Sequence, residues 1–215
     1  MAVRIVTVDS VTQTLPDGVL VASGLDNLPT RYVSLETVGL YLDGTNGAKL
    51  STPDNAALDV TDLDLSARVA PDAWVAGQIN VIAAKYNTSV SWQFYIATDG
   101  KLTLLWSANG STVAATVASS VVIPGVTDGS PLWVRATLDA DNGASGYDVK
   151  FYTAPDSEEI PGVADWTQFG TTTTGGATTT VFAGTSSMEF GSINGSSTGG
   201  FKGVLYRFVR RASID

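Results

Sequence analysis

Residues 62–69 read DLDLSARV, and apolar and polar side chains alternate strictly along them. The apolar positions are Leu63, Leu65, Ala67 and Val69. Successive side chains of a β-strand point to opposite faces, so this stretch predicts a strand with one face in a core and the other in solvent. On this interpretation Asp62 and Asp64 share the solvated face.

The same alternation recurs along the chain and predicts an antiparallel β-sandwich. It is clear in residues 91–96, 101–106 and 147–153. Further strands are expected at 39–43, 47–51, 79–86, 112–117, 119–123, 132–139, 179–183, 187–191 and 201–210, with one helical turn near 55–58. Asp-Gly and Asn-Gly pairs between them favour tight hairpins, because both residues tolerate a positive φ. Regular strands with such turns every 8–12 residues are typical of a sandwich.

Composition excludes several classes of function. The chain has 215 residues, 12 Lys+Arg against 21 Asp+Glu, a net charge of −9, and neither cysteine nor histidine. Disulfides, thiolate nucleophiles, Cys/His zinc sites and Ser-His-Asp triads are therefore excluded. A negative protein repels phosphate backbones, so we expect no nucleic-acid partner. No run of about 18 apolar residues occurs, so no membrane insertion is expected.

Two segments depart from the regular pattern. Residues 1–38 hold short apolar runs, and they form either an N-terminal arm that contacts another subunit or extra strands added to the sandwich domain of residues 39–215. They lack the long apolar region of a signal peptide. Residues 170–180, GTTTTGGATTT, predict a strand, a loop and a second strand, or alternatively a surface loop.

From residue 40 to 210 the chain resembles the concanavalin A-like lectin/glucanase superfamily, in particular its laminin-G-like branch. The segments that carry the resemblance are 41–46 (YLDGTN), 51–60 (STPDNAALDV), 63–71 (LDLSARVAP), 82–86 (IAAKY), 92–96 (WQFYI), 99–102 (DGKL), 133–139 (WVRATLD), 147–152 (YDVKFY) and 201–205 (FKGVL). The resemblance implies an all-β, two-sheet antiparallel jelly roll.

Free-standing copies without a signal peptide also resemble accessory proteins of bacteriophage virions. The resemblance therefore implies a non-enzymatic virion structural protein, either a capsid decoration or a minor tail accessory, assembled in the host cytoplasm and homo-oligomeric. Contacts with other virion proteins are expected through residues 1–38 and through the basic cluster Arg207, Arg210 and Arg211. Adhesion to a host-surface glycan would be compatible with this role. The alternative is a stand-alone, lectin-like carbohydrate-binding module of a bacterium.

A third hypothesis, glycoside hydrolysis, has little support in the sequence. Such catalysis needs two carboxylates on either side of the scissile bond, and the enzymes of this superfamily place them close together on one strand. The glutamates are Glu36, Glu158, Glu159 and Glu189. They do not form that pattern, and we expect no enzymatic activity.

Many lectin-like domains of this kind bind calcium, which prefers six to eight oxygen ligands. Asp139, Asp141 and Asn142 lie within five residues and are the candidate ligands. A hairpin rich in Asp, Asn and Gly explains the same stretch without a metal. A second acidic group comprises Asp43, Asn46, Asp54 and Asp59. No cofactor is required, and calcium is the one metal expected.

Glycan binding would use exposed aromatic rings. Trp74 and Trp166 lie in loop-like contexts, and Trp133 is out of phase with its apolar neighbours, so these three are the candidate sugar platforms. The alternative is a ring buried beneath a loop. Trp92 and Trp106 are in phase with apolar faces and are predicted core residues.

Overall fold

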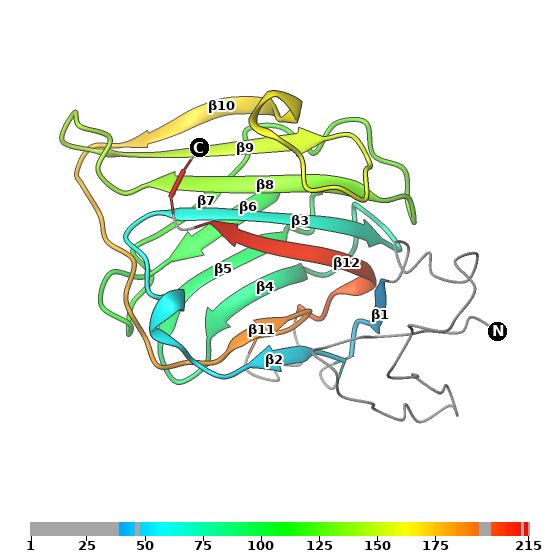
Figure 1. Cartoon of the computed structure of the whole chain (residues 1–215), viewed down its shortest axis with the longest axis horizontal. Helices are drawn as coiled ribbons and strands as arrows, with labels where there is room; N and C mark the ends of the chain where they lie inside the picture. Colours follow the sequence, from blue (N-terminus) through cyan, green and yellow to red (C-terminus); the bar gives the residue numbers. More distant parts are fainter. Residues whose placement is uncertain (1–38, 46–47, 194–198, 212, 215) are drawn as a thin grey trace, which may run out of the picture. The chain divides into compact units, whose positions relative to one another are not determined.

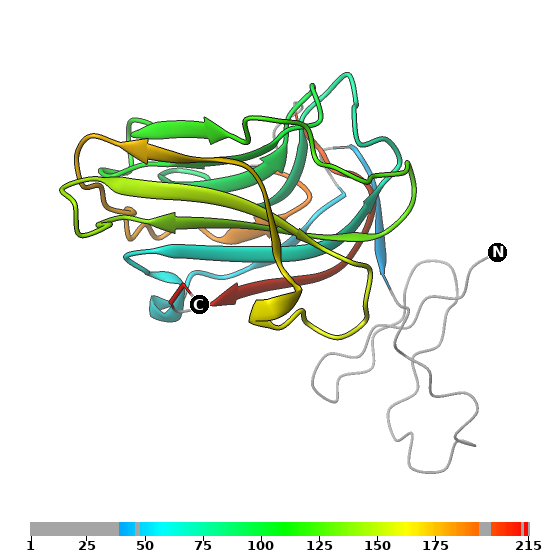
Figure 2. The ribbon, with the colours of Figure 1, turned by 90° about the horizontal axis from the view of Figure 1, so that it is seen from above.

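The computed structural model describes residues 39–45, 48–193, 199–211 and 213–214. Within them, two six-stranded antiparallel sheets pack face to face, which confirms the predicted jelly-roll sandwich (Figures 1 and 2). The segment 1–38, the proposed arm, lies outside the described residues.

The first sheet has the strand order β1-β12-β3-β8-β9-β10. Its strands are β1 (Leu40–Asp43), β12 (Lys202–Arg211), β3 (Leu63–Pro71), β8 (Leu132–Asp139), β9 (Tyr147–Ala154) and β10 (Thr167–Gly175). The second sheet has the order β2-β11-β4-β5-β6-β7. Its strands are β2 (Leu50–Thr52), β11 (Met188–Phe190), β4 (Asn80–Tyr86), β5 (Val90–Ile96), β6 (Leu102–Trp106) and β7 (Ala115–Ala118). Two single turns of 3-10 helix, η4 (Ala56–Leu58) and η5 (Val163–Asp165), complete the fold.

Most predicted strands form, and the helical turn expected near 55–58 is η4. Two predictions are wrong: residues 119–123 and 179–183 are not strands. In the second case the backbone N–H of Thr179 donates to Ala140, beyond β8, and that of Phe182 donates to Ser107, beyond β6. The segment thus bonds to the ends of both sheets instead of joining one ladder. The Thr/Gly stretch supplies β10 up to Gly175 and then leaves the sheet.

The core lies between the sheets, and two tryptophans join them. Trp92 and Trp106 are fully buried, as predicted. The ring of Trp92 on β5 stacks 6.3 Å from that of Phe208 on β12. The ring of Trp106 on β6 meets that of Tyr147 on β9 edge-on at 5.1 Å. Each pair combines a large buried apolar area with a favourable ring geometry, so both tie one sheet to the other.

The outer face of β3 is buried, which contradicts the predicted solvated face. Asp64 is 1% exposed, and Arg135 on β8 binds its carboxylate through two nitrogens at 2.8 and 2.6 Å. Asp62 accepts a hydrogen bond from the backbone of Ala140. The loop 155–166, drawn in yellow in Figure 2, lies outside this sheet, and its Asp156 binds Arg68 at 2.7 Å. Coverage by a distant loop explains why alternation alone misplaced these side chains.

Candidate functional site

The larger of the two described pockets lies where the turn after β1, the β3–β4 connection and the start of β12 meet, and its volume is about 680 Å³. This size is within the usual range of small-molecule sites. The pocket is lined by Asp43, Gly44, Thr45, Asp72, Ala73, Val75, Ala76, Gly77, Gln78, Asn80 and Lys202. Strand order explains the meeting, because β12 lies between β1 and β3 in the first sheet.

Buried hydrogen bonds fix the wall formed by the β3–β4 connection. Asn80 is 1% exposed, its amide nitrogen donates to the carbonyl of Ala73, and its amide oxygen accepts from the backbone N–H of Lys202. The amide nitrogen of Gln78 donates to the carbonyl of Gly200. Side-chain amides that cross-link loops in this way preorganise a site, because less freedom is lost when a ligand binds.

The turn after β1 needs a glycine. Gly44 has a φ of +82°, a left-handed conformation that is costly for residues with a Cβ. A Cβ there would lie 3.2 Å from both the amide nitrogen of Gln78 and the Cβ of Lys202. The close approach of this turn to Gln78 and Lys202 is what closes that side of the pocket.

The pocket is polar and carries a net negative charge. Asp43 accepts hydrogen bonds from the hydroxyl and the backbone N–H of Thr45, at 2.6 and 2.8 Å, and these bonds together with the nearby Lys202 lower the pKa of Asp43. Asp72 accepts from the hydroxyl of Tyr41 at 3.0 Å, and the ammonium of Lys202 lies 3.8 Å from it. Two carboxylates and one ammonium therefore face the pocket.

This arrangement suits a hydroxyl-rich ligand. Hydroxyl groups can donate to the carboxylates and accept from Lys202. Val75 is 65% exposed at the rim and offers an apolar contact for C–H groups. A cavity with a few convergent polar groups and an apolar wall is the usual form of a small-ligand site.

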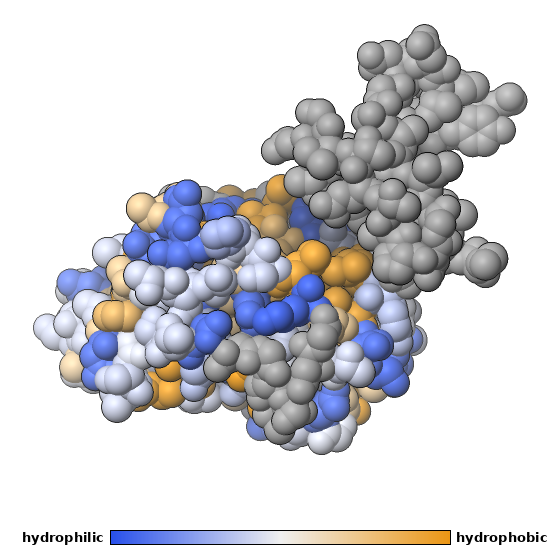
Figure 3. All heavy atoms as spheres, turned by 90° about the horizontal axis from the view of Figure 1, so that it is seen from below, coloured by the Kyte–Doolittle hydropathy of each residue, from blue (hydrophilic) through white to orange (hydrophobic). Residues whose placement is uncertain are grey.

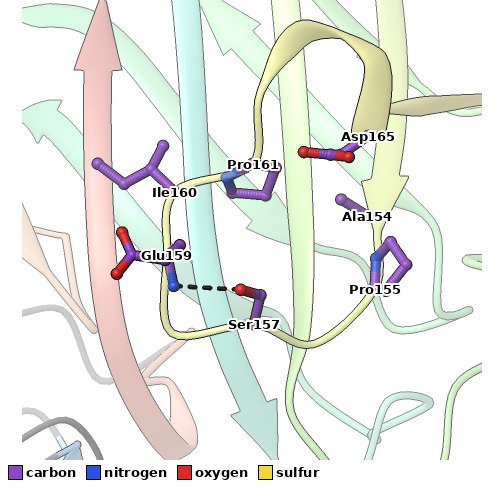
Figure 4. A pocket seen from close by; sticks show the side chains of 7 residues that line it. All are labelled: Ala154, Pro155, Ser157, Glu159, Ile160, Pro161 and Asp165. Atoms are coloured by element: carbon purple, nitrogen blue, oxygen red, sulfur yellow. Dashed lines mark hydrogen bonds between the residues drawn. The ribbon is translucent and has the colours of Figure 1, made fainter.

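The second described pocket is smaller, about 200 Å³, and lies within the loop 155–165 (Figure 4). The backbone N–H of Glu159 donates to the hydroxyl of Ser157, which holds the loop closed across it. Its volume is below the usual range of ligand pockets. It is a less suitable site than the pocket beside Asp72.

Figure 3 shows the face on which the edge strand β2 and its neighbour β11 lie, seen from below the view of Figure 1. Hydrophilic side chains cover much of this face, and apolar ones gather near its middle. β2 contributes Leu50, which is 50% exposed. An apolar area of this kind lacks the hydrogen-bonding groups that orient a small polar ligand.

The predicted sugar platforms are mostly buried. Trp74 is 2% exposed and its indole N–H donates to the carbonyl of Thr127, so the exposure predicted for it is wrong. Trp133 is fully buried, and its indole N–H donates to Ser157. Trp166 is half-buried, edge-on to Trp133 at 6.3 Å. The structure thus joins Trp133 and Trp166, but as a packing pair rather than as two open faces.

The predicted calcium ligands are engaged in a hairpin. The amide oxygen of Asn142 accepts from the backbone of Ala144 and Gly146, and Asp141 accepts from Gly143. Among the described residues, no group of three or more acidic side chains is placed to hold a metal ion. In the second acidic group, Asp54 and Asp59 bind Lys85, whereas Asp43 lines the pocket. Calcium at Asp139, Asp141 and Asn142 stays a prediction.

The hairpin gives a pH-dependent prediction. The hydroxyl of Thr174 and the amide of Asn142 bind Asp148 and lower its pKa. Because the pKa of Asp148 is lower in the folded than in the unfolded chain, its ionised form stabilises the fold at any pH above the unfolded-state pKa. This contribution is lost as the pH falls through the folded-state pKa. We expect Thr174→Val to raise the Asp148 pKa and to lower the free energy of unfolding by less than about 1 kcal/mol at neutral pH. An NMR titration of the Asp148 carboxyl checks this; an unchanged pKa would contradict it.

The basic cluster is divided by the structure. Arg207 pairs with Arg68 and Arg211 with Asp64 in the register of β12 and β3, so both lie on the outer face of the first sheet. Arg210 pairs with Leu65, on the opposite face, and donates to the carbonyl of Ala57. The three guanidinium groups therefore do not form the single contact surface that the sequence predicted.

The sequence missed most of the pocket. Asp72, Gln78 and Lys202 were not predicted as site residues, and Asp43 was named only as part of an acidic group. Asp43 and Asp72 do lie in short segments with Gly44 and Pro71 that signal turns. That signal marks two loops, but it does not show that the loops meet.

Comparison with known proteins shows the fold but not a family. Neither a protein-family model nor a curated protein matches the chain. The carbohydrate-binding module CBM40 of the Ruminococcus gnavus IT-sialidase, bound to α2,3-sialyllactose, is similar at a TM-score of 0.50 and 13% identity, over 82% of this chain and 90% of that one. The same module without ligand gives the same values. A heptameric SAP-like pentraxin from Limulus polyphemus matches at a TM-score of 0.38 and 13% identity, over 75% and 74%.

The chain therefore has a lectin-like jelly-roll fold. Among the described residues, no helix is long and apolar enough to cross a membrane.

Proposed function

We propose that this chain is a non-enzymatic glycan-binding module that holds a saccharide in the pocket beside Asp72 and Lys202. The observation that carries the proposal is the pocket itself, which has a volume of about 680 Å³. Two carboxylates, one ammonium and the exposed side chain of Val75 line it, and hydrogen bonds within the protein fix one of its walls. The sialyllactose-binding CBM40 has the same fold, which supports this choice among ligand classes.

The carboxylates would provide most of the recognition. Asp43 is held by two hydrogen bonds from Thr45, and Asp72 by the hydroxyl of Tyr41, so both present their remaining lone pairs in fixed positions. Hydrogen bonds to charged groups contribute about 1.5–3 kcal/mol each, roughly twice the contribution of neutral ones. Lys202 adds a donor for ring or hydroxyl oxygens.

Removal of one carboxylate should abolish most of the binding. We expect Asp72→Ala to weaken saccharide binding at least about tenfold, because each 1.4 kcal/mol is a factor of ten in affinity. The measurement is a glycan array followed by calorimetric titration of the strongest ligand. Glu159→Ala is the matched control, since Glu159 is an exposed carboxylate outside this pocket.

Two outcomes would contradict the proposal. The first is an array on which no glycan binds, with and without calcium. The second is equal affinity of wild type and Asp72→Ala when both have the same melting temperature. Release of reducing sugar from β-glucans would contradict its non-enzymatic part.

The predicted role in a bacteriophage virion rests on the sequence resemblance. Residues 1–38, which were to carry its subunit contacts, lie outside the described residues. A glycan-binding pocket is compatible with that role, since a particle could use it to adhere to a host surface.

A further inference from the structure

We propose that the pocket selects saccharides without acidic groups and rejects sialylated, uronic and sulfated ones. This inference rests on the proposed function and names the ligand class of the same site. It departs from the ligand of the structurally similar CBM40, which is bound to sialyllactose. A shared fold does not fix the charge of the ligand, because the ligand is recognised by side chains that differ between proteins.

The first argument is the balance of charge. Asp43 and Asp72 are carboxylates, and Lys202 is the one cationic side chain among the described lining residues. The ammonium of Lys202 lies 3.8 Å from the carboxylate of Asp72, and its charge also lowers the pKa of Asp43. Its positive charge is therefore already balanced by the two carboxylates of the pocket. An added carboxylate or sulfate would meet two like charges, and juxtaposed like charges are strongly unfavourable.

The second argument is the supply of donors and acceptors. One N–H of the Gln78 amide donates to the carbonyl of Gly200, which leaves its second N–H and its amide oxygen for a ligand. Asn80 uses both ends of its amide within the protein. With two carboxylates against one ammonium, the pocket offers more acceptors than donors. Sugar hydroxyls can donate hydrogen bonds to these acceptors. An ionised acid group has no proton to donate, so it would lose its hydrogen bonds to water and gain none from the acceptors of the pocket.

The third argument is the field of the whole chain. Its net charge of −9 repels anionic ligands before contact and slows their association. This long-range contribution is screened by salt, whereas the contribution of Asp43 and Asp72 acts at contact. Raising the salt concentration should therefore reduce the discrimination against acidic sugars without abolishing it.

The test uses paired oligosaccharides that differ by one acidic group: lactose with α2,3-sialyllactose, cellobiose with its terminal glucuronic acid form, and N-acetyllactosamine with its sulfated form. The full chain is titrated with each at low and at physiological salt. For every pair in which binding occurs, we expect the neutral member to bind at least about tenfold more tightly. In Asp43→Asn/Asp72→Asn this ratio should approach one at physiological salt, where repulsion by the rest of the chain is largely screened.

The outcomes separate the two proposals. Equal or tighter binding of the acidic members would overturn the charge selection and leave glycan binding intact. A ratio unchanged in the double variant would also overturn it, since the discrimination would then arise elsewhere. Absence of binding to all six saccharides, and to a wider array, would overturn the proposed function and this inference with it.

Discussion

Replacement of Arg135 by methionine is expected to lower the free energy of unfolding by about 3–5 kcal/mol. The side chains of Arg135 and Asp64 are 4% and 0% exposed, and two short hydrogen bonds join them across β8 and β3. Methionine keeps much of the apolar stem but leaves the Asp64 carboxylate buried, with Arg211 at 3.7 Å as its remaining ion-pair partner in the described part of the chain. A buried carboxylate that loses its main partner is strongly destabilising.

The guanidinium of Arg135 also packs against aromatic rings, and a second variant separates the two effects. It lies 5.3 Å from the ring centre of Tyr152 and 5.5 Å from that of Trp166. In Asp64→Leu/Arg135→Met the orphaned charge is gone, so we expect most of the lost stability to return. Urea unfolding measures both. A loss below about 1 kcal/mol in Arg135→Met would contradict the argument.

Lys85→Met is expected to cost about 3 kcal/mol, the second-largest effect. Lys85 on β4 is 1% exposed, and its ammonium contacts Asp54 at 2.9 Å, Asp59 at 3.1 Å and the carbonyl of Gly184. These contacts hold the η4 segment and the connection before β11 against the sandwich. The two carboxylates are 28% and 35% exposed, so they regain water when Lys85 is removed, which makes the loss smaller than for Arg135.

The matched control for Lys85 is Lys101→Met. Lys101 pairs with Asp99 at 3.0 Å, but both side chains are well exposed, at 34% and 53%. A surface pair of this kind contributes at most about 1 kcal/mol. The two variants remove the same charge, but Lys85 is buried with three partners whereas Lys101 is exposed and pairs with one carboxylate, so unfolding in urea should separate them clearly. Equal losses would show that burial of Lys85 has little energetic weight.

The sequence predicted one face of β3 well and the other face poorly. In β3, alternation correctly placed Leu65 and Val69 in the core, because period-two patterning reflects local geometry. It placed Asp64 in solvent, whereas the side chain is buried and bound by Arg135, which lies 71 residues away on β8. Local pattern carries no information on such a distant partner, so burial of a polar face could not be foreseen.

The predictions of exposed tryptophans and of the site residues failed for a related reason. The loop context of Trp74 predicted an exposed ring, but the ring is buried and its indole N–H donates to the carbonyl of Thr127. Asp43, Asp72 and Lys202 meet because β12 lies between β1 and β3, an order that no local motif encodes. Strand identity follows from periodicity, whereas a pocket follows from strand order and loop contacts.

The claim that the pocket beside Asp72 is the glycan site is tested most directly by NMR chemical-shift mapping of the strongest neutral saccharide from the array. We expect the largest shifts at residues 43–45, at 72–78 and at Lys202, with little change at the outer face of the second sheet. Shifts concentrated instead on that face, for instance at Leu105 of β6 and Thr116 of β7, would place the saccharide elsewhere and contradict the account.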